Sequence, residues 1–280
     1  MRYFPVMICA ALACPAQAQE TMRLGVFGVV EKVNPLVVAG REVRVPEGLP
    51  VISPLGPGLE ISVGDTLALV VRPEEGRLVA VRMLEIYPIV GPVSEVTAST
   101  ATVMGTQVHL PPDTSVRVGT AIAVSGLWSG ETVITTAIRR IEWQGFGQLV
   151  GPLDSAGPLR MGKTGISGAQ APQDGFGDHV WMLSGEPAGN QLSVRLMAKG
   201  VFGGNVDLAL WQGYASAPIA SQTYMIHGTG IVGTARDAQM PGPGTLVTRC
   251  AHDGRVIRDV PKAREAAFAL LDCARYIPVD

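Results

Sequence analysis

The sequence predicts an all-β protein made of small closed barrels in tandem, with one short helix near the C-terminus. Two observations carry this prediction: a composition of strand and turn formers, and an outline of residues that recurs along the chain. Hydrophobic residues, many of them Val, make up 47% of the chain, charged residues only 16%, and there are 34 Gly and 21 Pro. Val favours strands, whereas Gly and Pro favour turns, so the mixture is typical of an all-β chain.

Residues 1–18 are predicted to be a secretory signal peptide. Arg2 precedes an apolar run that ends at Cys14, and the AQA sequence ending at Ala18 has the small-x-small form that signal peptidase reads. We therefore expect cleavage after Ala18 and export, to the periplasm of a Gram-negative bacterium. The alternative is a lipoprotein anchored through Cys14. The apolar run is shorter than the roughly 20 residues that span a bilayer, and no later run is longer without interruption, so no integral membrane segment is expected in the mature chain.

The charge balance argues against nucleic acid as a partner. Removing the signal peptide takes away one charge, Arg2, and changes the formal net charge from −2 to −3. A weakly acidic protein has no general attraction for nucleic acid, and aromatic residues, at 5%, are few for the stacking platforms of single-strand binders. The four tryptophans are Trp128, Trp143, Trp181 and Trp211. We expect them in core and rim packing, with a protein-binding or glycan-binding face as the alternative.

A pattern of strand and turn residues occurs three times along the chain. The first copy contains "LGVFGVVEKVNPLVVAGREVRV", "SVGDTLALVV" and "GRLVAVRMLEI"; the second contains "IVGPVSEVTASTATVMGTQVHL", "RVGTAIAVSG" and "GETVITTAIRRIE"; the third, looser copy contains "QLVGPLDSAGPLRMGKTGI", "FGDHVWMLSG" and "GNQLSVRLMAKG". A marker glycine recurs at spacings of 63 and 60 residues, at Gly28, Gly91 and Gly151. A turn glycine recurs at spacings of 55 and 58 residues, at Gly64, Gly119 and Gly177. The two glycine markers therefore recur independently at similar spacings, which indicates a repeated unit.

Each copy reads as strands joined by turns, and it is expected to close on itself. Gly64 and Gly119 are expected to adopt positive φ in a tight turn, which a side chain would obstruct. The polar residues beside the turn glycines can bond nearby backbone groups, and they are Asp65, Thr120 and Asp178. Small antiparallel sheets escape exposed edges by closing, so we expect tandem OB-like β-barrels. The predicted ranges are 22–87 for unit 1, 88–143 for unit 2, 144–228 for a looser unit 3, and 229–280 for a β segment with the C-terminal helix.

The first two copies resemble a known family. The order Gly-x-Val, a "VVAGREVRV" type second strand, "VGD" before a Val-rich strand and a closing "LVAVRMLEI" resemble the exported bacterial family called domain of unknown function 5666. Leu24 to Glu142 carry the resemblance best, and the remainder carries it weakly or not at all. The resemblance implies small β-barrels in tandem in an exported protein. It implies no established activity and no catalytic residue.

The segment "DVPKAREAAFALLDCARY" is the one convincing helix in the sequence. Asp259 is a suitable N-cap, and Pro261 fits the first turn. An apolar stripe indicates packing against the barrels, and it comprises Ala263, Ala267, Leu270, Leu271 and Ala274. Cys273 is expected in the last turn of this helix.

Two cysteines remain after cleavage, because Cys9 and Cys14 leave with the signal peptide. Cys250 and Cys273 are an even pair in an oxidising compartment, which favours a disulfide. Closing a loop of that length stabilises a fold by about 3 kcal/mol in the chain-entropy model. The bridge would join the helix to the strand that ends at Cys250. The alternative is two buried free thiols.

Two glycine-rich motifs match nucleotide-binding patterns and are predicted to be turns. "GPLRMGKT", Gly157 to Thr164, matches the phosphate loop, but "GISGAQAPQDGFG" after it cannot form the helix that such a loop needs. "GTGIVG", Gly228 to Gly233, matches the dinucleotide fingerprint, but Pro241 leaves room for at most one helical turn after it. We interpret the first motif as a hairpin and the second as a turn and a strand.

Side chains suited to catalysis or metal binding are few. The four histidines are His109, His179, His227 and His252. They never occur as H-x-x-x-H, and a lone His on a β surface is usually solvated. The charged pairs Arg139-Arg140 and Glu74-Glu75 are expected to be exposed on hairpins. No catalytic, cofactor-binding or metal-binding residue is predicted, and no cofactor.

The sequence therefore predicts a non-enzymatic exported β-barrel repeat protein that binds or scaffolds, with a protein or glycan of the cell envelope as its partner. Such a protein would expose an apolar or aromatic face on one barrel. The rival hypothesis is a periplasmic hydrolase or metal-dependent enzyme whose site is assembled between units, and it predicts a deep pocket where His or acidic side chains converge. In a third hypothesis the barrels only space other components, and neither a patch nor a pocket is expected.

Overall fold

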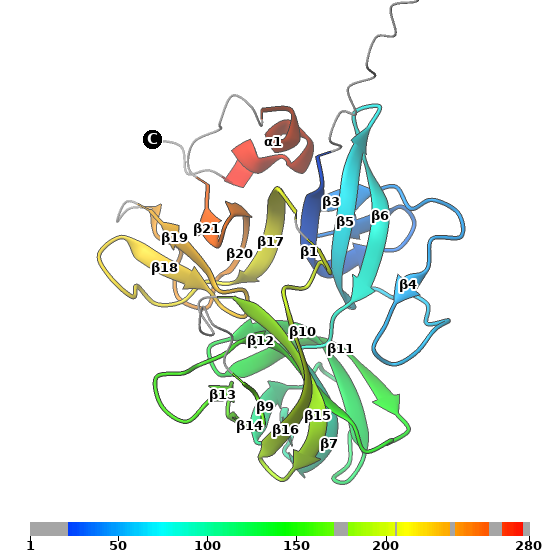
Figure 1. The fold of residues 1–280 in the computed structure, drawn as a ribbon, viewed down its shortest axis with the longest axis vertical. Helices are drawn as coiled ribbons and strands as arrows, with labels where there is room; N and C mark the ends of the chain where they lie inside the picture. Colours follow the sequence, from blue (N-terminus) through cyan, green and yellow to red (C-terminus); the bar gives the residue numbers. More distant parts are fainter. Residues whose placement is uncertain (1–21, 171–178, 205, 236–238, 258–264, 277–280) are drawn as a thin grey trace, which may run out of the picture.

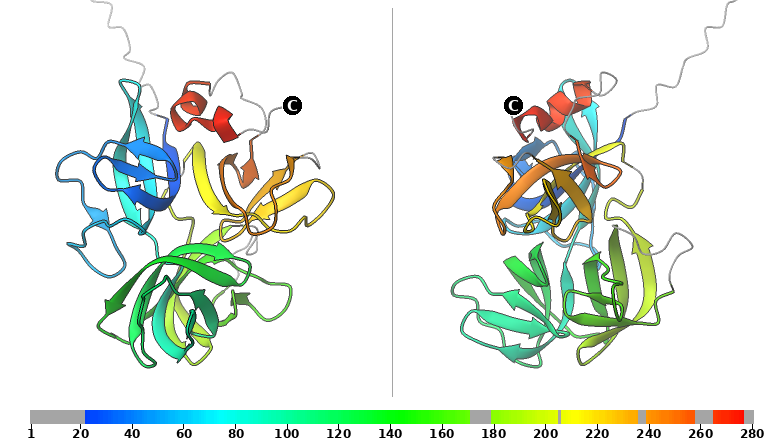
Figure 2. Two further views of the ribbon diagram at one scale, coloured as in Figure 1. Left: turned by 180° about the vertical axis from the view of Figure 1, so that it is seen from behind. Right: turned by 90° about the vertical axis from the view of Figure 1, so that its left-hand side faces the viewer.

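The computed structural model describes residues 22–170, 179–204, 206–235, 239–257 and 265–276. Its strands form four small barrels, called units 1 to 4 in chain order, and a helix lies at one end of the molecule (Figure 1). Units 1 and 4 lie side by side, and units 2 and 3 lie together below them, as two further views also show (Figure 2). The described residues confirm the predicted all-β fold with one short α-helix.

Unit 1 closes into a ring of strands. Its strands are β1 Leu24–Lys32, β2 Leu36–Val38, β3 Arg41–Val43, β4 Val51–Ile52, β5 Thr66–Glu74 and β6 Arg77–Glu85. The antiparallel pairs are β1 with β2, β1 with β5, β2 with β3, and β5 with β6. A parallel bridge between Arg44 and Val79 joins the end of β3 to β6. The chain then meets β6 again as β4, after a loop in which Pro46 and Pro50 cannot donate ladder hydrogen bonds.

Units 2, 3 and 4 repeat this order with five strands each. Unit 2 contains β7 Ile89–Val96, β8 Thr100–Val103, β9 Thr106–His109, β10 Ala121–Ser129 and β11 Thr132–Ile141. Unit 3 contains β12 Gly147–Pro152, β13 Arg160–Met161, β14 Thr164–Ser167, β15 Val180–Ala188 and β16 Gln191–Lys199. Unit 4 contains β17 Leu208–Tyr214, β18 Thr223–Ile226, β19 Ile231–Thr234, β20 Leu246–His252 and β21 Arg255–Val256.

The order of pairing is the same in all four units. Unit 1 has β4 as an additional strand, so β5 and β6 are its counterparts of the fourth and fifth strands. The first strand pairs with the second and the fourth, and the third strand runs parallel to the fifth. In units 3 and 4, single bridges join the first strand to the second, at Asp154–Arg160 and Ala215–Ile226. In unit 2, a direct ladder between β7 and β10 completes the ring. This five-stranded order is that of an OB-like barrel, as predicted.

The fourth barrel was not predicted, and it changes one expected boundary. β17 falls inside the range 144–228 expected for unit 3, but it pairs with β20 of the following segment and with β1. Residues 208–256 therefore form a unit of their own, because the first strand of a barrel must meet the fourth. The marker glycine recurs here too, since Gly213 lies 62 residues after Gly151.

The marker glycines let each barrel close. They lie in the first strands, at Gly28, Gly91, Gly151 and Gly213. A Cβ at Gly28 would come within 2.8 Å of Ala39 Cβ, and one at Gly213 within 2.5 Å of Ile226 Cγ2. A Cβ at Gly91 would come within 3.1 Å of Met104, and one at Gly151 within 2.8 Å of Trp128 Nε1 from unit 2 and 3.2 Å of Met161. Ala39, Met104, Met161 and Ile226 belong to the hairpin of the second and third strands, so a bare backbone allows that hairpin to pack across the first strand.

Each turn glycine holds the first strand through two backbone hydrogen bonds. The Gly64 N–H donates to the Val30 carbonyl at 2.9 Å, and the Val30 N–H donates to the Asp65 carbonyl at 2.8 Å. The same bonds join Gly119 and Thr120 to Val93, and Gly244 and Thr245 to Ala215. The φ angles of +93° at Gly64 and +84° at Gly119 confirm the predicted left-handed turns. Gly177 and Asp178 lie outside the described residues.

The four units share a central apolar cluster. The first strands of units 1 and 4 pair in parallel, β1 with β17, and those of units 2 and 3 pair antiparallel, β7 with β12. Side chains from all four units then meet in one cluster, which includes Phe27, Ile86, Leu127, Val180, Phe202 and Ala209. The Phe202 ring stands edge-on to Trp211 with ring centroids 5.2 Å apart. The barrels therefore pack on each other, as predicted.

The C-terminal helix is shorter than expected. α1 spans Glu265–Leu271 and the 3-10 helix η3 spans Cys273–Tyr276. Ala267 and Leu271 are buried as predicted, but Ala274 is exposed, and Cys273 lies in η3 and not in the last turn of the α-helix. The reason is Asp272, whose positive φ of 55° ends the helix. Residues 259–264 of the predicted helix, which include Asp259, Pro261 and Ala263, lie outside the described residues.

The predicted disulfide between Cys250 and Cys273 is present, with the two Cα atoms 5.7 Å apart. Both cysteines are buried among the core side chains of unit 1 and α1, including Leu69 and Phe268. The bridge therefore ties η3 to β20 and holds α1 over units 1 and 4. No helix among the described residues is long and apolar enough to cross a membrane. The predicted signal peptide, with Cys14, precedes the first described residue.

Candidate binding site

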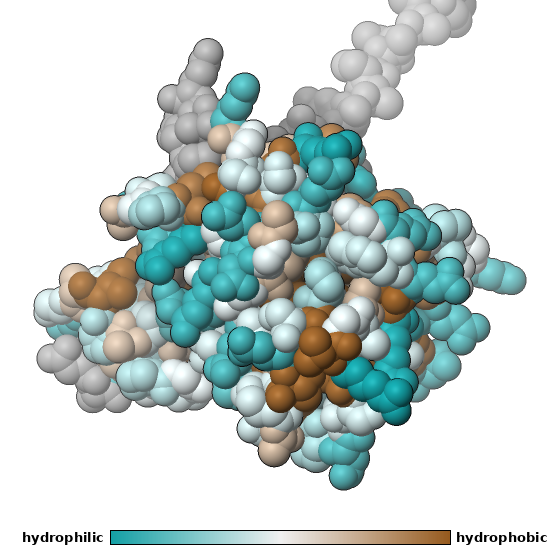
Figure 3. Space-filling view, turned by 90° about the horizontal axis from the view of Figure 1, so that it is seen from below, coloured by the Kyte–Doolittle hydropathy of each residue, from teal (hydrophilic) through white to brown (hydrophobic). Residues whose placement is uncertain are grey.

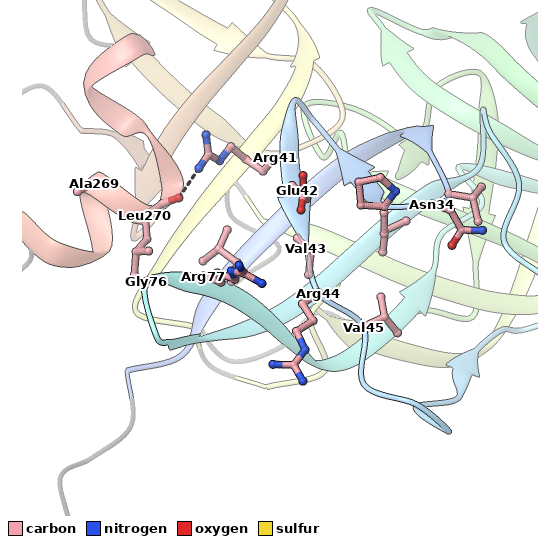
Figure 4. A pocket seen from close by; sticks show the side chains of 14 residues that line it. Asn34, Arg41, Glu42, Val43, Arg44, Val45, Gly76, Arg77, Ala269 and Leu270 are labelled. Atoms are coloured by element: carbon pink, nitrogen blue, oxygen red, sulfur yellow. Dashed lines mark hydrogen bonds between the residues drawn. The ribbon is translucent and has the colours of Figure 1, made fainter.

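A pocket of about 640 Å³ lies between unit 1 and α1 (Figure 4). Its walls are the loop after β1, the β2–β3 hairpin, the turn between β5 and β6, and the end of α1. Its polar lining residues are Asn34, Arg41, Glu42, Arg44 and Arg77. In OB-like barrels the binding face is formed by the second and third strands, with the loop after the first strand and the loop between the fourth and fifth strands. In unit 1 these two loops are the loop after β1 and the turn between β5 and β6. The pocket therefore lies where this fold binds its ligands.

Two tight turns place the arginines at the pocket. In the β2–β3 turn, Ala39 and Gly40 both have positive φ, 51° and 74°. In the β5–β6 turn, Glu75 and Gly76 do so as well, with φ of 50° and 74°. Positive φ at both central residues is the geometry of the two-residue hairpin turn that matches strand twist. Because arginines follow both turns directly, the turns determine where the guanidinium groups emerge.

Arg41 connects the hairpin to the helix. Its Nη2 donates to the Leu270 carbonyl at 2.7 Å, and its Nη1 lies 3.3 Å from Asp272 Oδ2. A cation at the C-terminal end of a helix is favoured by the partial negative charge of the last carbonyls. Arg41 therefore closes one side of the pocket and has only part of its donor set left for a ligand.

Arg44 and Arg77 are more available. Arg44 Nη1 lies 3.9 Å from Glu74 Oε1, and both side chains are well exposed, so this ion pair is weak. Among the described residues, Arg77 has no ion-pair partner. Glu42 is the single acidic residue in the pocket wall. The wall thus carries three positive charges and one negative charge in a chain whose formal net charge is −2.

The chemistry of this wall suits an anion. A guanidinium group presents a planar fork of donors that matches carboxylate and phosphate oxygens. Positive charges gathered in a concave wall also raise the local concentration of anions. The sequence analysis did not single out these arginines. A weak signal was available, because "GREVRV" and "EEGR" place arginines beside the two predicted turns, but only the folded chain brings them to one face.

A second pair of pockets lies between units 3 and 4. A pocket of about 180 Å³ is lined by His179, His252 and Asp253, and a neighbouring one of about 650 Å³ by His179 and Asp253. His252 Nε2 lies 3.1 Å from Asp253 Oδ2. Within the described ranges, no group of three His, Cys, Asp or Glu side chains is arranged to hold a metal ion. The space between units 3 and 4 thus brings two histidines and one carboxylate to one pocket wall, without the arrangement that a metal ion needs.

The other two histidines lie apart from these pockets. His109 is exposed at the end of β9, and His227 is partly buried in the turn between β18 and β19. Burial lowers the pKa of His227. Neither lies in a described pocket with a carboxylate, so neither is assigned a chemical role.

Arg139 is not the exposed hairpin charge that was predicted. Its side chain is 25% exposed and forms ion pairs with Asp65 and Glu85, whose side chains are only 2% exposed. Its Nη2 also donates to the Glu60 carbonyl at 3.0 Å. Burial raises the pKa of Asp65, and this effect outweighs the Ser62 N–H and Arg139, which lower it. The cluster joins unit 2 to the buried side of unit 1, so we assign it a structural role.

The two nucleotide-like motifs form turns and strands, as predicted. In "GPLRMGKT" the strands β13 and β14 form an antiparallel hairpin, and the following Thr164 hydroxyl donates to the Met104 carbonyl at 2.7 Å. In "GTGIVG", Gly228 and Gly230 have positive φ in a turn, and β19 begins at Ile231. As far as the described residues go, each motif continues directly into a strand, β14 or β19, so neither places a helix N-terminus directly after its glycines.

The tryptophans differ in their exposure. Trp128 and Trp181 are buried, and the Trp128 Nε1–H donates to the Val150 carbonyl at 2.7 Å. Trp143 is 42% exposed. Figure 3 shows an apolar patch on the face formed by units 2 and 3, surrounded by hydrophilic residues and smaller apolar areas. The predicted apolar or aromatic binding face stays a prediction, and we take the charged pocket beside α1 as the candidate site because its lining residues define a specific chemistry.

Comparison with models of protein families, with curated proteins and with solved structures finds no match to this chain. The resemblance to domain of unknown function 5666 therefore stays a prediction, and the site is interpreted from its geometry and chemistry alone.

Proposed function

We propose that the chain is a non-enzymatic, exported binding protein of the cell envelope that holds an acidic glycan on unit 1. The observation that carries this proposal is the pocket beside α1, where Arg41, Arg44 and Arg77 line the face on which OB-like barrels bind oligosaccharides and oligonucleotides. The other units act as the scaffold that supports this face, because β17 flanks β1 and the disulfide holds α1 in position.

A glycan fits this wall better than a nucleic acid or a peptide strand. None of the residues that line the pocket is aromatic, so the wall offers no stacking platform for bases. The strands beside it are largely paired, β2 with β1 and β3, and β6 with β5 and β4, and the end of β3 is bonded to β6 through Arg44, so β3 offers only a short edge to an added peptide strand. Carboxylate and hydroxyl oxygens of an acidic glycan can accept hydrogen bonds from Arg77, Arg44 and Asn34.

Export to the periplasm is part of the proposal. The sequence of residues 1–18 supports it, and so does the disulfide between Cys250 and Cys273, because such bonds persist in oxidising compartments. Mass measurement of the protein from a membrane-free periplasmic extract tests this directly. A mature chain that begins at Gln19 supports the proposal, whereas an acylated chain that begins at Cys14 identifies a lipoprotein.

The binding proposal is tested by calorimetric titration of the oxidised mature protein with a polygalacturonate oligosaccharide. Loss of one charge-assisted contact corresponds to about a tenfold change in Kd, so Arg77→Gln is expected to weaken binding by about that factor. Arg195→Gln is the matched control, because Arg195 is exposed on β16, far along the chain from unit 1. The proposal is wrong if both variants bind alike, or if a neutral oligosaccharide, polyglutamate or single-stranded DNA binds more tightly than the polyuronate.

A further inference from the structure

Unit 1 has a second arginine-lined pocket, on a different face. It has a volume of about 360 Å³ and is lined by Arg23, Val70, Arg72, Val81, Arg82 and the segment 202–204. It shares no lining residue with the pocket beside α1. The six arginines of residues 22–87 are divided between the two pockets, three in each: Arg41, Arg44 and Arg77 in the first, and Arg23, Arg72 and Arg82 in the second.

Arg82 is held in place by the linker between units 3 and 4. Its Nη1 donates to the Gly203 carbonyl at 2.7 Å. A Cβ on Gly203 would come within 2.6 Å of the guanidinium carbon, so the glycine allows the linker to lie directly against this group. The Arg82 Nε is buried and has no hydrogen-bond partner among the described residues. The guanidinium is thus oriented by the backbone, while part of its donor set remains unused.

The positive charges of Arg23 and Arg72 are only partly balanced by nearby carboxylates. Arg72 Nη2 lies 2.7 Å from Glu74 Oε2, and the backbone N–H of Arg23 donates to Asp207 Oδ2 at 3.0 Å. Neither carboxylate lines the pocket. Three guanidinium groups therefore border the pocket, and both nearby acids lie outside its wall.

The remaining wall of the pocket is apolar. Val70 and Phe202 are almost fully buried, whereas Val81 is 42% exposed. Val81 is the extra residue at a bulge, because Val70 pairs with Arg82 and Val71 pairs with Ala80. The bulge turns an apolar side chain outward beside three cations. A ligand in this pocket would meet three guanidinium groups together with Val81 and Phe202.

We propose that this pocket binds a small phosphate monoester that carries a short apolar group. The phosphate would lie among Arg23, Arg72 and Arg82, and the apolar group against Val81 and Phe202. A phosphate monoester carries about −1.5 to −2 charges at pH 7, which matches three guanidinium groups better than the single charge of a carboxylate. At about 30 Å³ per water molecule, the volume equals that of roughly twelve waters, which is enough for a short alkyl phosphate.

Calorimetric titration of the oxidised mature protein with hexyl phosphate, inorganic phosphate and hexanoate tests this assignment. Hexyl phosphate is expected to bind about tenfold more tightly than either of the other two, because only it uses both walls. Arg23→Gln is expected to weaken hexyl phosphate binding about tenfold, and no contact of the Arg23 side chain is required for folding. Val81→Ser is expected to weaken the binding of hexyl phosphate and leave that of inorganic phosphate unchanged.

Two controls separate this pocket from the proposed glycan site. Arg77→Gln changes only the pocket beside α1, and Arg195→Gln changes neither pocket, so both are expected to bind hexyl phosphate as the parent protein does. The assignment is overturned if Arg23→Gln binds unchanged, if Arg77→Gln loses binding instead, or if hexanoate binds as tightly as hexyl phosphate. Equal affinity for inorganic phosphate and hexyl phosphate would also overturn it, because the apolar wall would then have no role.

Discussion

Gly213→Ala tests whether the fourth barrel closes as the other three do. Ala at this position would place its Cβ 2.5 Å from Ile226 Cγ2 and 3.2 Å from the His227 carbonyl oxygen. Ordinary carbon contacts lie at about 3.5–4.0 Å, so Ile226 would have to move by roughly 1 Å. It has little freedom to do so, because it is fully buried and the next residue donates its N–H to the Tyr214 carbonyl at 2.8 Å.

The expected loss of stability follows from two opposing effects. Overpacking of this kind costs about 1–3 kcal/mol, while Ala in place of Gly lowers the entropy of the unfolded chain and recovers about 0.4–1 kcal/mol. The net loss is expected to be about 1–2 kcal/mol. For a chain of this size that corresponds to a fall in Tm of roughly 2–8 °C.

Urea denaturation of the oxidised protein, followed by circular dichroism, measures this loss. Gly157→Ala is the matched control, because no atom lies within 4 Å of the position its Cβ would occupy. The control is expected to unfold within about 0.5 kcal/mol of the parent protein. If Gly213→Ala unfolds no more easily than Gly157→Ala, the close approach of the hairpin to the first strand does not require glycine, and the explanation of the marker glycines fails.

Three further predictions concern the buried ion pairs and the disulfide. Arg139→Met leaves Asp65 and Glu85 buried without their cation. The free energy of unfolding should therefore fall by about 3–5 kcal/mol at pH 7 and by less at pH 4. Equal losses at both pH values would contradict this prediction. Burial raises the folded-state pKa of Asp65 above its usual 3.8. This carboxyl group therefore stabilises the fold below pH 3.8 and loses that contribution as the pH rises through the raised pKa. Asp65→Asn should abolish this part of the pH dependence of urea unfolding, and an unchanged profile would refute the reasoning. Reducing the Cys250–Cys273 bond should lower the free energy of unfolding by about 3 kcal/mol, and identical urea midpoints with and without reductant would argue against its contribution.

The repeat was predictable where the backbone demanded a particular residue. Gly64 and Gly119 need positive φ, so glycine is retained and the period can be read from the sequence. The bonds that hold the first strand are between backbone atoms, and the polar residue beside each glycine adds a side-chain bond, as predicted: the Ser62 N–H donates to Asp65 Oδ2 at 2.7 Å, and the Thr120 hydroxyl donates to the Arg117 carbonyl at 2.6 Å. Unit 4 keeps the same bonds at Gly244, but there the surrounding residues are "PGPGT" and not "VGD" or "VGT". Its membership of the series therefore could not be recognised from side-chain patterns.

The roles of charged residues could not be predicted from the sequence. Arg139 and Arg140 are neighbours on one strand, and the sequence does not distinguish them. Arg139 is partly buried and pairs with Asp65, whereas Arg140 is exposed and donates to the Ser115 carbonyl at 2.6 Å. The difference depends on how unit 2 docks on unit 1, and strand periodicity does not specify docking. The arginines at both pockets were missed for the same reason, since each pocket combines unit 1 with a segment from much later in the chain.

The way the units pair explains why unit 1 carries both candidate sites. Units 2 and 3 join through β7 and β12, whereas unit 1 joins unit 4 through β1 and β17, so the first and last barrels become neighbours. The linker at 202–204 then reaches one face of unit 1, and α1, tied to β20 by the disulfide, reaches another. Unit 1 alone would present only part of each wall. Both candidate sites therefore depend on how unit 1 packs against the segments that follow unit 3 and unit 4.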